Sequence, residues 1–95
     1  MTPKLPLDFT KVESLRKHML LTTTDLSQLL GVSRMTYYGW VRGKKIRQSN
    51  DQSVRAMLRK LLAVMSEHQW PAPEVIAMEQ KQRKERLVEI LGNYN

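Results

Sequence analysis

The chain has 95 residues, a formal net charge of +7 and no cysteine, and 41% of its residues are hydrophobic. This size and balance suit one small folded domain, and the lack of cysteine excludes disulfides, thiolate zinc sites and cysteine nucleophiles. The apolar runs are too short to span a membrane and the N-terminus lacks the apolar stretch of a signal peptide, so we expect a cytoplasmic protein.

The first helix is predicted from a capping pattern followed by apolar residues at helical spacing. Thr10 and Glu13 have the spacing of a capping box, in which each side chain accepts a hydrogen bond from a backbone amide, and Asp8 is an alternative cap. The apolar positions that follow are Val12, Leu15 and Met19. A helix over residues 9–20 is therefore predicted.

Two short helices are predicted next, on either side of a three-residue turn. Gly31 ends the first of them, because glycine tolerates the left-handed conformation that a sharp turn needs. Ser33 caps the second, which covers residues 34–42 and ends at Gly43. The first of the two begins with a second capping box, formed by Thr22 and Asp25.

Two longer helices complete the prediction. The fourth begins after Ser49 or Asn50 and ends near His68, which falls on its apolar edge and is expected to be partly buried. The prolines of residues 69–73 interrupt the chain, and a fifth helix is predicted over 74–92. No segment has the pattern of a strand, so we predict an all-α, five-helix fold.

The positive charge is concentrated in one part of the chain. Residues 34–60 contain eight basic side chains and one acidic one, Asp51, so their net charge of +7 equals that of the whole chain. This concentration points to a polyanionic partner, either nucleic acid or an acidic membrane surface. The eight basic residues are Arg34, Arg42, Lys44, Lys45, Arg47, Arg55, Arg59 and Lys60.

The two short helices and their turn have the pattern of a helix-turn-helix. Locking two such helices at a steep angle requires buried side chains, and the five positions concerned are all apolar or aromatic. Ser27, where the helices approach most closely, is small. The five positions are Leu26, Leu30, Val32, Tyr37 and Trp40.

The segment "LTTTDLSQLLGVSRMTYYGWVRGKK" resembles the helix-turn-helix of the phage repressor and Cro family, whose members commonly read "LTQxELAxLLGVSxxTIxxWExGxx". The resemblance is close over residues 21–45 and extends to 9–65 in the order of the helices, while the last thirty residues have no counterpart. Val41 departs from the pattern, where an acidic residue is common, and so does Tyr37, which is bulkier than the usual isoleucine or valine.

The resemblance implies that the second helix of the pair lies in the major groove of double-stranded DNA. With Tyr37 and Trp40 buried, helical geometry turns the residues on the opposite face of this helix toward the DNA. Thr23 occupies the place of a glutamine often found in the family. The expected base contacts are Arg34, Met35, Tyr38 and Ser33, where Met35 and Tyr38 contact either a thymine methyl or a phosphate. The expected backbone contacts are Thr23, Thr36, Arg42, Lys44, Lys45 and Arg47.

Two further features of the basic segment have alternative interpretations. Gly39 falls on the outward face of the reading helix, where it either allows close approach to DNA or is merely tolerated. Arg55 and Arg59 lie one turn apart on the fourth helix, where they either extend the track of phosphate contacts or form a solvated face.

The C-terminal segment, residues 71–95, is expected to be a linker and helix beside a DNA-binding domain over 1–70. Its apolar end either docks back on the domain or joins two chains, and we favour a homodimer because one helix-turn-helix reads few base pairs. The central segment "EQKQRKER" is expected to be solvated, with Lys81, Arg83, Lys84 and Arg86 as further DNA candidates. The expected dimer contacts are Ile76, Leu87, Ile90, Leu91 and Tyr94.

Other functional classes fit the sequence less well. His18 and His68 have no neighbouring ligands, and there is no catalytic serine–histidine–carboxylate pattern or glycine-rich phosphate loop. We therefore expect no enzyme activity, cofactor, metal or small-molecule ligand. Binding to a membrane surface is disfavoured because the apolar faces are needed for the core.

We expect a sequence-specific transcriptional regulator bound to the nucleoid, a small repressor that occludes a promoter. One alternative is a protein-interaction module in which the same fold binds polymerase, a nucleoid protein or a toxin. Another is an architectural or recombination accessory protein that binds DNA with low specificity.

Overall fold

The computed structural model describes residues 7–93, which form six helices and no strand. The predicted all-α class is confirmed, but the predicted number of five helices is wrong, because the last one is divided in two. The helices are α1 (Phe9–His18), α2 (Thr23–Leu30), α3 (Arg34–Val41), α4 (Gln48–Glu67), α5 (Pro73–Ile76) and α6 (Gln80–Leu91).

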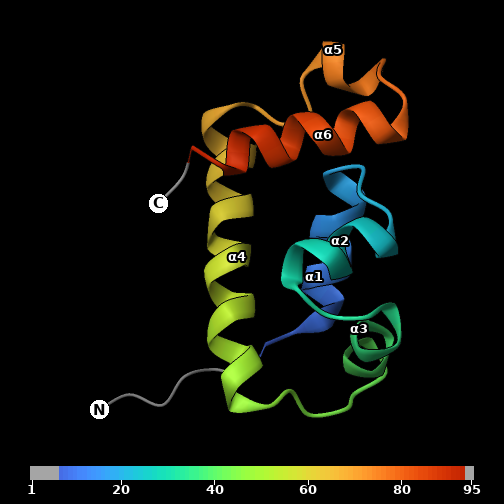
Figure 1. Cartoon of the computed structure of the whole chain (residues 1–95), viewed down its shortest axis with the longest axis vertical. Helices are drawn as coiled ribbons and strands as arrows, with labels where there is room; N and C mark the ends of the chain where they lie inside the picture. The colour runs from blue at the N-terminus through green and yellow to red at the C-terminus, as the bar shows by residue number, and fades with distance from the viewer. Residues whose placement is uncertain (1–6, 94–95) are drawn as a thin grey trace.

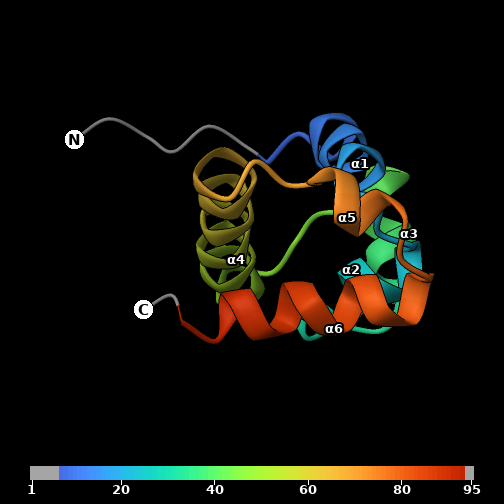
Figure 2. The same cartoon turned by 90° about the horizontal axis from the view of Figure 1, so that it is seen from above.

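The long helix α4 forms one side of the molecule and α2 packs against it, while α3 packs on α1 and α2 (Figure 1). One end of α6 lies against α4 and the other reaches α2, so α6 closes the end of the molecule opposite α3 (Figure 1 and Figure 2). The outer surface of α3 is therefore remote from α5 and α6.

The helix starts follow local hydrogen bonds. Helix α1 begins at Phe9 as predicted, and Asp8, the alternative cap, accepts a hydrogen bond from the Thr10 amide at 3.0 Å, whereas the predicted capping box of Thr10 and Glu13 does not form the cap. Helix α4 begins at Gln48, two or three residues earlier than predicted, because the Arg47 carbonyl already accepts hydrogen bonds from the amides of Asn50 and Asp51. The predicted capping box at the start of α2 is confirmed.

The turn between α2 and α3 is built from local signals. Gly31 has a φ of 75°, and the Val32 amide donates to the Ser27 carbonyl across it, which closes α2 with a Schellman motif. Ser33 then caps α3 by accepting a hydrogen bond from the Thr36 amide at 3.1 Å. Helix α3 ends in the same way at Gly43, whose φ is 108°. The predicted turn and both helix ends are confirmed.

A single hydrophobic cluster includes side chains from all six helices and extends past residue 70. The predicted burial of the residues between α2 and α3 is confirmed, with Val32 packed against the cluster from its edge. The largest contributors are Phe9, Met19, Leu21, Leu26, Leu30, Tyr37, Trp40, Leu58, Leu61, Trp70, Leu87 and Leu91.

The predicted helix over residues 74–92 is interrupted between Ile76 and Gln80. Val75 and Leu87 are both buried in the core. In one continuous helix their side chains would point about 120° apart, since twelve residues at 3.6 per turn leave that remainder. The break allows both side chains to reach the same core.

Arg83 joins the two pieces, α5 and α6. Its guanidinium donates to the carbonyls of Val75 and Ile76, both at 3.1 Å, and of Met78 at 2.8 Å. It also donates to Oε1 of Gln80 at 2.7 Å. Arg83 therefore satisfies carbonyls that the end of the short helix α5 leaves without intrahelical partners.

The N-terminal half of α6 is attached to α2 by polar contacts. Nε2 of Gln80 donates to Oδ2 of the buried Asp25 at 2.7 Å and to the Leu20 carbonyl at 3.0 Å. Lys84 Nζ donates to Oε1 of Gln28 and lies 3.8 Å from Oδ1 of Asp25. The expectation of a solvated central segment is therefore wrong for Gln80, Arg83 and Lys84.

Two further observations concern the surface. His68, expected to be partly buried, is exposed at the C-terminal cap of α4, so that prediction is wrong. Within residues 7–93, none of the helices has both the length and the apolar character needed to cross a membrane.

Replacing Arg83 with alanine is expected to lower the free energy of unfolding by about 2–3 kcal/mol, because hydrogen bonds from a charged donor to four acceptors are lost. Urea unfolding followed by circular dichroism measures the change. Arg86→Ala is the matched control: Arg86 is exposed on the same helix, and its loss is expected to change stability by less than about 0.5 kcal/mol. Equal effects of the two substitutions would contradict this role of Arg83.

Candidate nucleic-acid interface

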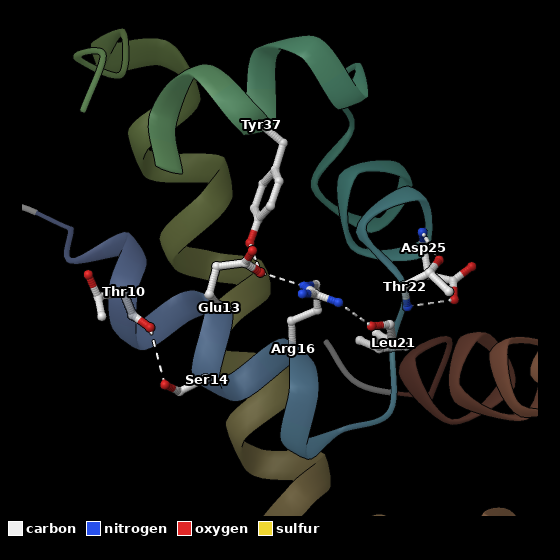
Figure 3. A network of polar contacts seen from close by, with 8 residues as sticks. All are labelled: Thr10, Glu13, Ser14, Arg16, Leu21, Thr22, Asp25 and Tyr37. Atoms are coloured by element: carbon white, nitrogen blue, oxygen red, sulfur yellow. Dashed lines mark hydrogen bonds and ion pairs between the residues drawn. The ribbon is translucent and has the colours of Figure 1, made fainter. Parts of the chain in front are cut away.

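Helix α3 is held on α1 through the side chain of Tyr37 (Figure 3). The Tyr37 hydroxyl donates to Oε2 of Glu13 at 3.0 Å, and Arg16 Nε donates to the same oxygen. Nη1 of Arg16 continues the chain to the Leu21 carbonyl at 2.9 Å, just before α2. The network therefore links α1, the start of α2 and the middle of α3.

The charges of this network reinforce one another. Burial alone would raise the pKa of Glu13, but the hydrogen bonds from Arg16 and Tyr37 outweigh it and hold the pKa below its ordinary value. The hydrogen bond to Glu13 raises the pKa of Arg16. Burial, together with the Glu13 carboxylate, raises the pKa of Tyr37 far above its ordinary value near 10. At neutral pH the arrangement thus keeps a carboxylate between a guanidinium and an un-ionised phenol.

Aromatic side chains support the inner face of α3. Phe9 of α1 contacts Trp40 with ring centroids 5.5 Å apart and meets Tyr37 edge-on at 6.3 Å. Sequence reasoning did not single out Phe9, although an aromatic residue beside the helix cap is a visible signal for core packing. The rings of Tyr38 and Tyr37 have centroids 6.5 Å apart, and Tyr38 remains 41% exposed.

The outer face of α3 carries the side chains predicted to read bases, and all four are exposed. Arg34 is the first residue of the helix, and the side chain of Met35 beside it is 85% exposed. The Ser33 hydroxyl donates to the Thr36 hydroxyl at 3.0 Å, so these two form a polar edge at the helix start. The expected base contacts thus lie exposed from the cap of α3 at Ser33 to Tyr38 in the middle of the helix.

The loop after α3 adds positive charge beside this face. Arg42, Lys44, Lys45 and Arg47 are all exposed. A concavity of about 460 Å³ separates the loop from α3. Its lining residues are Met35, Thr36, Gly39, Trp40, Lys44, Lys45, Arg47 and Asn50. Asn50, which sequence reasoning did not connect with the site, enters it because α4 begins early.

The side chain of Lys44 packs over Gly39. The sequence predicted either close approach to DNA or mere tolerance of the glycine, and did not predict this contact. A Cβ atom built at Gly39 would lie 3.1 Å from Cδ of Lys44. The Lys44 amide also donates to the Gly39 carbonyl at 2.9 Å, as part of the Schellman motif that ends α3. The aliphatic part of Lys44 therefore covers the glycine, and the Lys44 side chain is exposed beside α3.

The other candidate DNA contacts either bind residues of the same chain or lie away from the outer face of α3. Arg55 forms an ion pair with Asp51, whereas Arg59 is exposed on α4. Thr23 is half-buried at the start of α2. Arg83 and Lys84 make the intramolecular contacts described above, at the end of the molecule opposite α3 (Figure 1).

The residues expected to form a dimer contact do not share a free face. Leu87 and Leu91 are buried in the core of their own chain, and Ile90 packs against it. Ile76 is 56% exposed on α5, and Tyr94 lies outside the described residues. The apolar end of α6 thus docks back on α4, the other arrangement considered for it.

In the described part of the chain, no three histidine, aspartate or glutamate side chains lie close enough together to hold a metal ion. No family model, curated protein or solved structure matches the chain. The interface is therefore characterised by its own geometry and charge.

Tyr37→Phe is expected to lower the free energy of unfolding at pH 7 by about 1.5–3 kcal/mol, because it removes a hydrogen bond to a charged acceptor. The folded protein holds the Tyr37 proton more tightly than the unfolded chain does, so this contribution is complete below pH 10 and is lost as the pH rises further. Denaturant unfolding at several pH values tests this. The variant is expected to lose stability less steeply above pH 10 than the wild type, and identical slopes would contradict the assignment.

Gly39→Ala is expected to raise the free energy of unfolding by less than about 1 kcal/mol, because the gain in helix propensity is reduced by displacement of Lys44. In a Lys44→Ala background the gain is expected to reach the full value of about 1 kcal/mol. Urea unfolding of the four proteins measures this coupling. The same gain in both backgrounds would show that Lys44 does not occupy the space over Gly39.

Proposed function

We propose that α2 and α3 form a helix-turn-helix of the phage repressor and Cro type, and that α3 enters the major groove of double-stranded DNA. The observation that carries the proposal is the coincidence of charge and shape at α3. Exposed Arg34, Arg42, Lys44, Lys45 and Arg47 surround its outer face, while its inner face is fixed to the core by Tyr37 and Trp40. Backbone contacts by such cations position a protein on DNA, and side chains of the inserted helix then read bases.

We further propose that the protein is a sequence-specific transcriptional regulator that represses by occluding a promoter. It acts as a homodimer in this proposal, because a single inserted helix contacts few base pairs and two half-sites supply the missing affinity. The proposal includes no catalytic activity, cofactor or small-molecule ligand. A footprint that never overlaps polymerase sites would contradict repression by occlusion.

The proposal is tested by selecting a pool of random DNA duplexes with the full chain at about 0.15 M salt and sequencing the enriched molecules. An enriched inverted repeat with half-sites about one helical turn apart is expected. Binding without enrichment that disappears as salt rises would favour a low-specificity architectural protein. Absence of binding would favour an interaction module for an acidic protein surface.

Arg34→Ala is expected to weaken binding to the selected duplex by about 1–3 kcal/mol and to leave binding to unrelated DNA nearly unchanged, because a guanidinium reads guanine through two hydrogen bonds. Lys45→Ala is expected to weaken binding to both duplexes and to reduce the salt dependence. Titrations by fluorescence anisotropy measure both effects.

The matched control for these two substitutions is Arg86→Ala, which removes the same charge from the opposite end of the molecule. It is expected to bind both duplexes like the wild type. A loss in this control equal to that of Arg34→Ala would mean that total charge, and not the face of α3, determines binding.

A further inference from the structure

We infer that α3 recognises thymine through its methyl group, and that Met35 and Tyr38 determine this specificity. The inference rests on the proposed function and deepens it, since it names the base pairs that the same face would select. It follows from three observations: the exposure of Met35 and Tyr38, the chemistry of the other α3 side chains, and the surrounding charge.

The first observation is an apolar strip on the outermost part of α3. Met35 is 85% exposed, the largest value among the exposed large hydrophobic residues of the described chain, and Tyr38 is 41% exposed. Val41, one further step along the helix, is 37% exposed. The Tyr38 ring also contacts the buried Tyr37 ring, with their centroids 6.5 Å apart.

The second observation is what the outer face lacks. The sequence of α3, RMTYYGWV, has one guanidinium and no amide or carboxylate side chain. Paired recognition of adenine uses asparagine or glutamine, and recognition of cytosine uses a carboxylate, so neither is available from this helix. Guanine can be read by Arg34. Of the groups in the major groove, the thymine methyl is the apolar one that Met35 and Tyr38 can cover.

The third observation is that cations frame the strip. Met35 lines the concavity beside α3 together with Lys44, Lys45 and Arg47. Arg34 directly precedes Met35 in the sequence. An apolar protein partner would leave these charges without counterions. A nucleic-acid duplex satisfies both features, because its phosphates neutralise the cations while the methyl groups in its groove cover the apolar strip.

Helix geometry limits where the two thymines lie. Residues three apart on a helix have Cβ atoms about 5–6 Å apart, and base pairs are stacked about 3.4 Å apart. Met35 and Tyr38 therefore reach methyl groups separated by one or two base-pair steps. Arg34, adjacent to Met35 at the start of the helix, is expected to read a guanine next to this pair.

The experiment replaces each thymine of the selected duplex with uracil, which removes the methyl group and preserves base pairing. At two positions in each half-site, the affinity of the wild-type protein is expected to fall about four-fold. This factor corresponds to about 0.8 kcal/mol for burying one such carbon group. Met35→Ala is expected to bind thymine and uracil duplexes equally at one of these positions, and Tyr38→Ala at the other.

Val88→Ala is the matched control, because Val88 is 47% exposed on α6, remote from α3. It is expected to retain the full preference for thymine. Circular dichroism before titration verifies that each variant is folded.

A selected duplex whose affinity changes less than two-fold with uracil at every position overturns this inference and leaves the proposed function standing. The same holds if Met35→Ala and Tyr38→Ala both keep the wild-type preference. If no duplex is selected, the proposed function and the inference fail together.

Discussion

The side chain of Tyr37 fixes α3 on the rest of the molecule, through its burial in the core and through a hydrogen bond from its hydroxyl to the Glu13 carboxylate. This hydrogen bond crosses from the helix that carries the candidate interface to the helix beneath it, and Arg16 fixes the acceptor from the other side. A short helix of eight residues has little stability of its own, so its orientation has to come from tertiary contacts. Tyr37 supplies both apolar burial and a directional polar contact, which together define how α3 is rotated about its axis.

That rotation decides which side chains face outward. With Tyr37 and Trp40 inside, Met35, Tyr38 and Arg34 are presented together, and the loop after α3 returns beside them. The stem of Lys44 lies over Gly39, so the loop and helix form one surface instead of two separate ones. The concentration of positive charge in this part of the sequence thereby becomes a concentration on one face. In the proposed function, the cations of this face attract phosphates and its small apolar region selects among bases.

At the opposite end of the molecule, the polar and charged side chains of α6 make contacts within the chain. Gln80, Arg83 and Lys84 resemble a solvated helical surface in the sequence, but each makes contacts within the chain. Arg83 binds the carbonyls at the end of α5, and Gln80 reaches the buried carboxylate of Asp25. The polar residues of α6 therefore act as structural contacts that secure it across α2, while Leu87 and Leu91 secure it against the core. The apolar residues that heptad spacing assigns to a dimer contact at the end of α6 are thereby used within the chain.

The sequence by itself determined the features that depend on neighbouring residues. The capping box at Thr22, the cap at Ser33 and the turn at Gly31 involve hydrogen bonds over a few residues, and helical periodicity identified the buried side of α3. Only the tertiary structure decided the partners of Glu13 and Asp25, which lie 24 and 55 residues away in the chain, and the division of the last helix. The physical reason is that a local sequence pattern specifies only hydrogen bonds within a few residues. The distant partner of a side chain such as Glu13 or Asp25 depends on which residues the packing of the whole chain brings next to it.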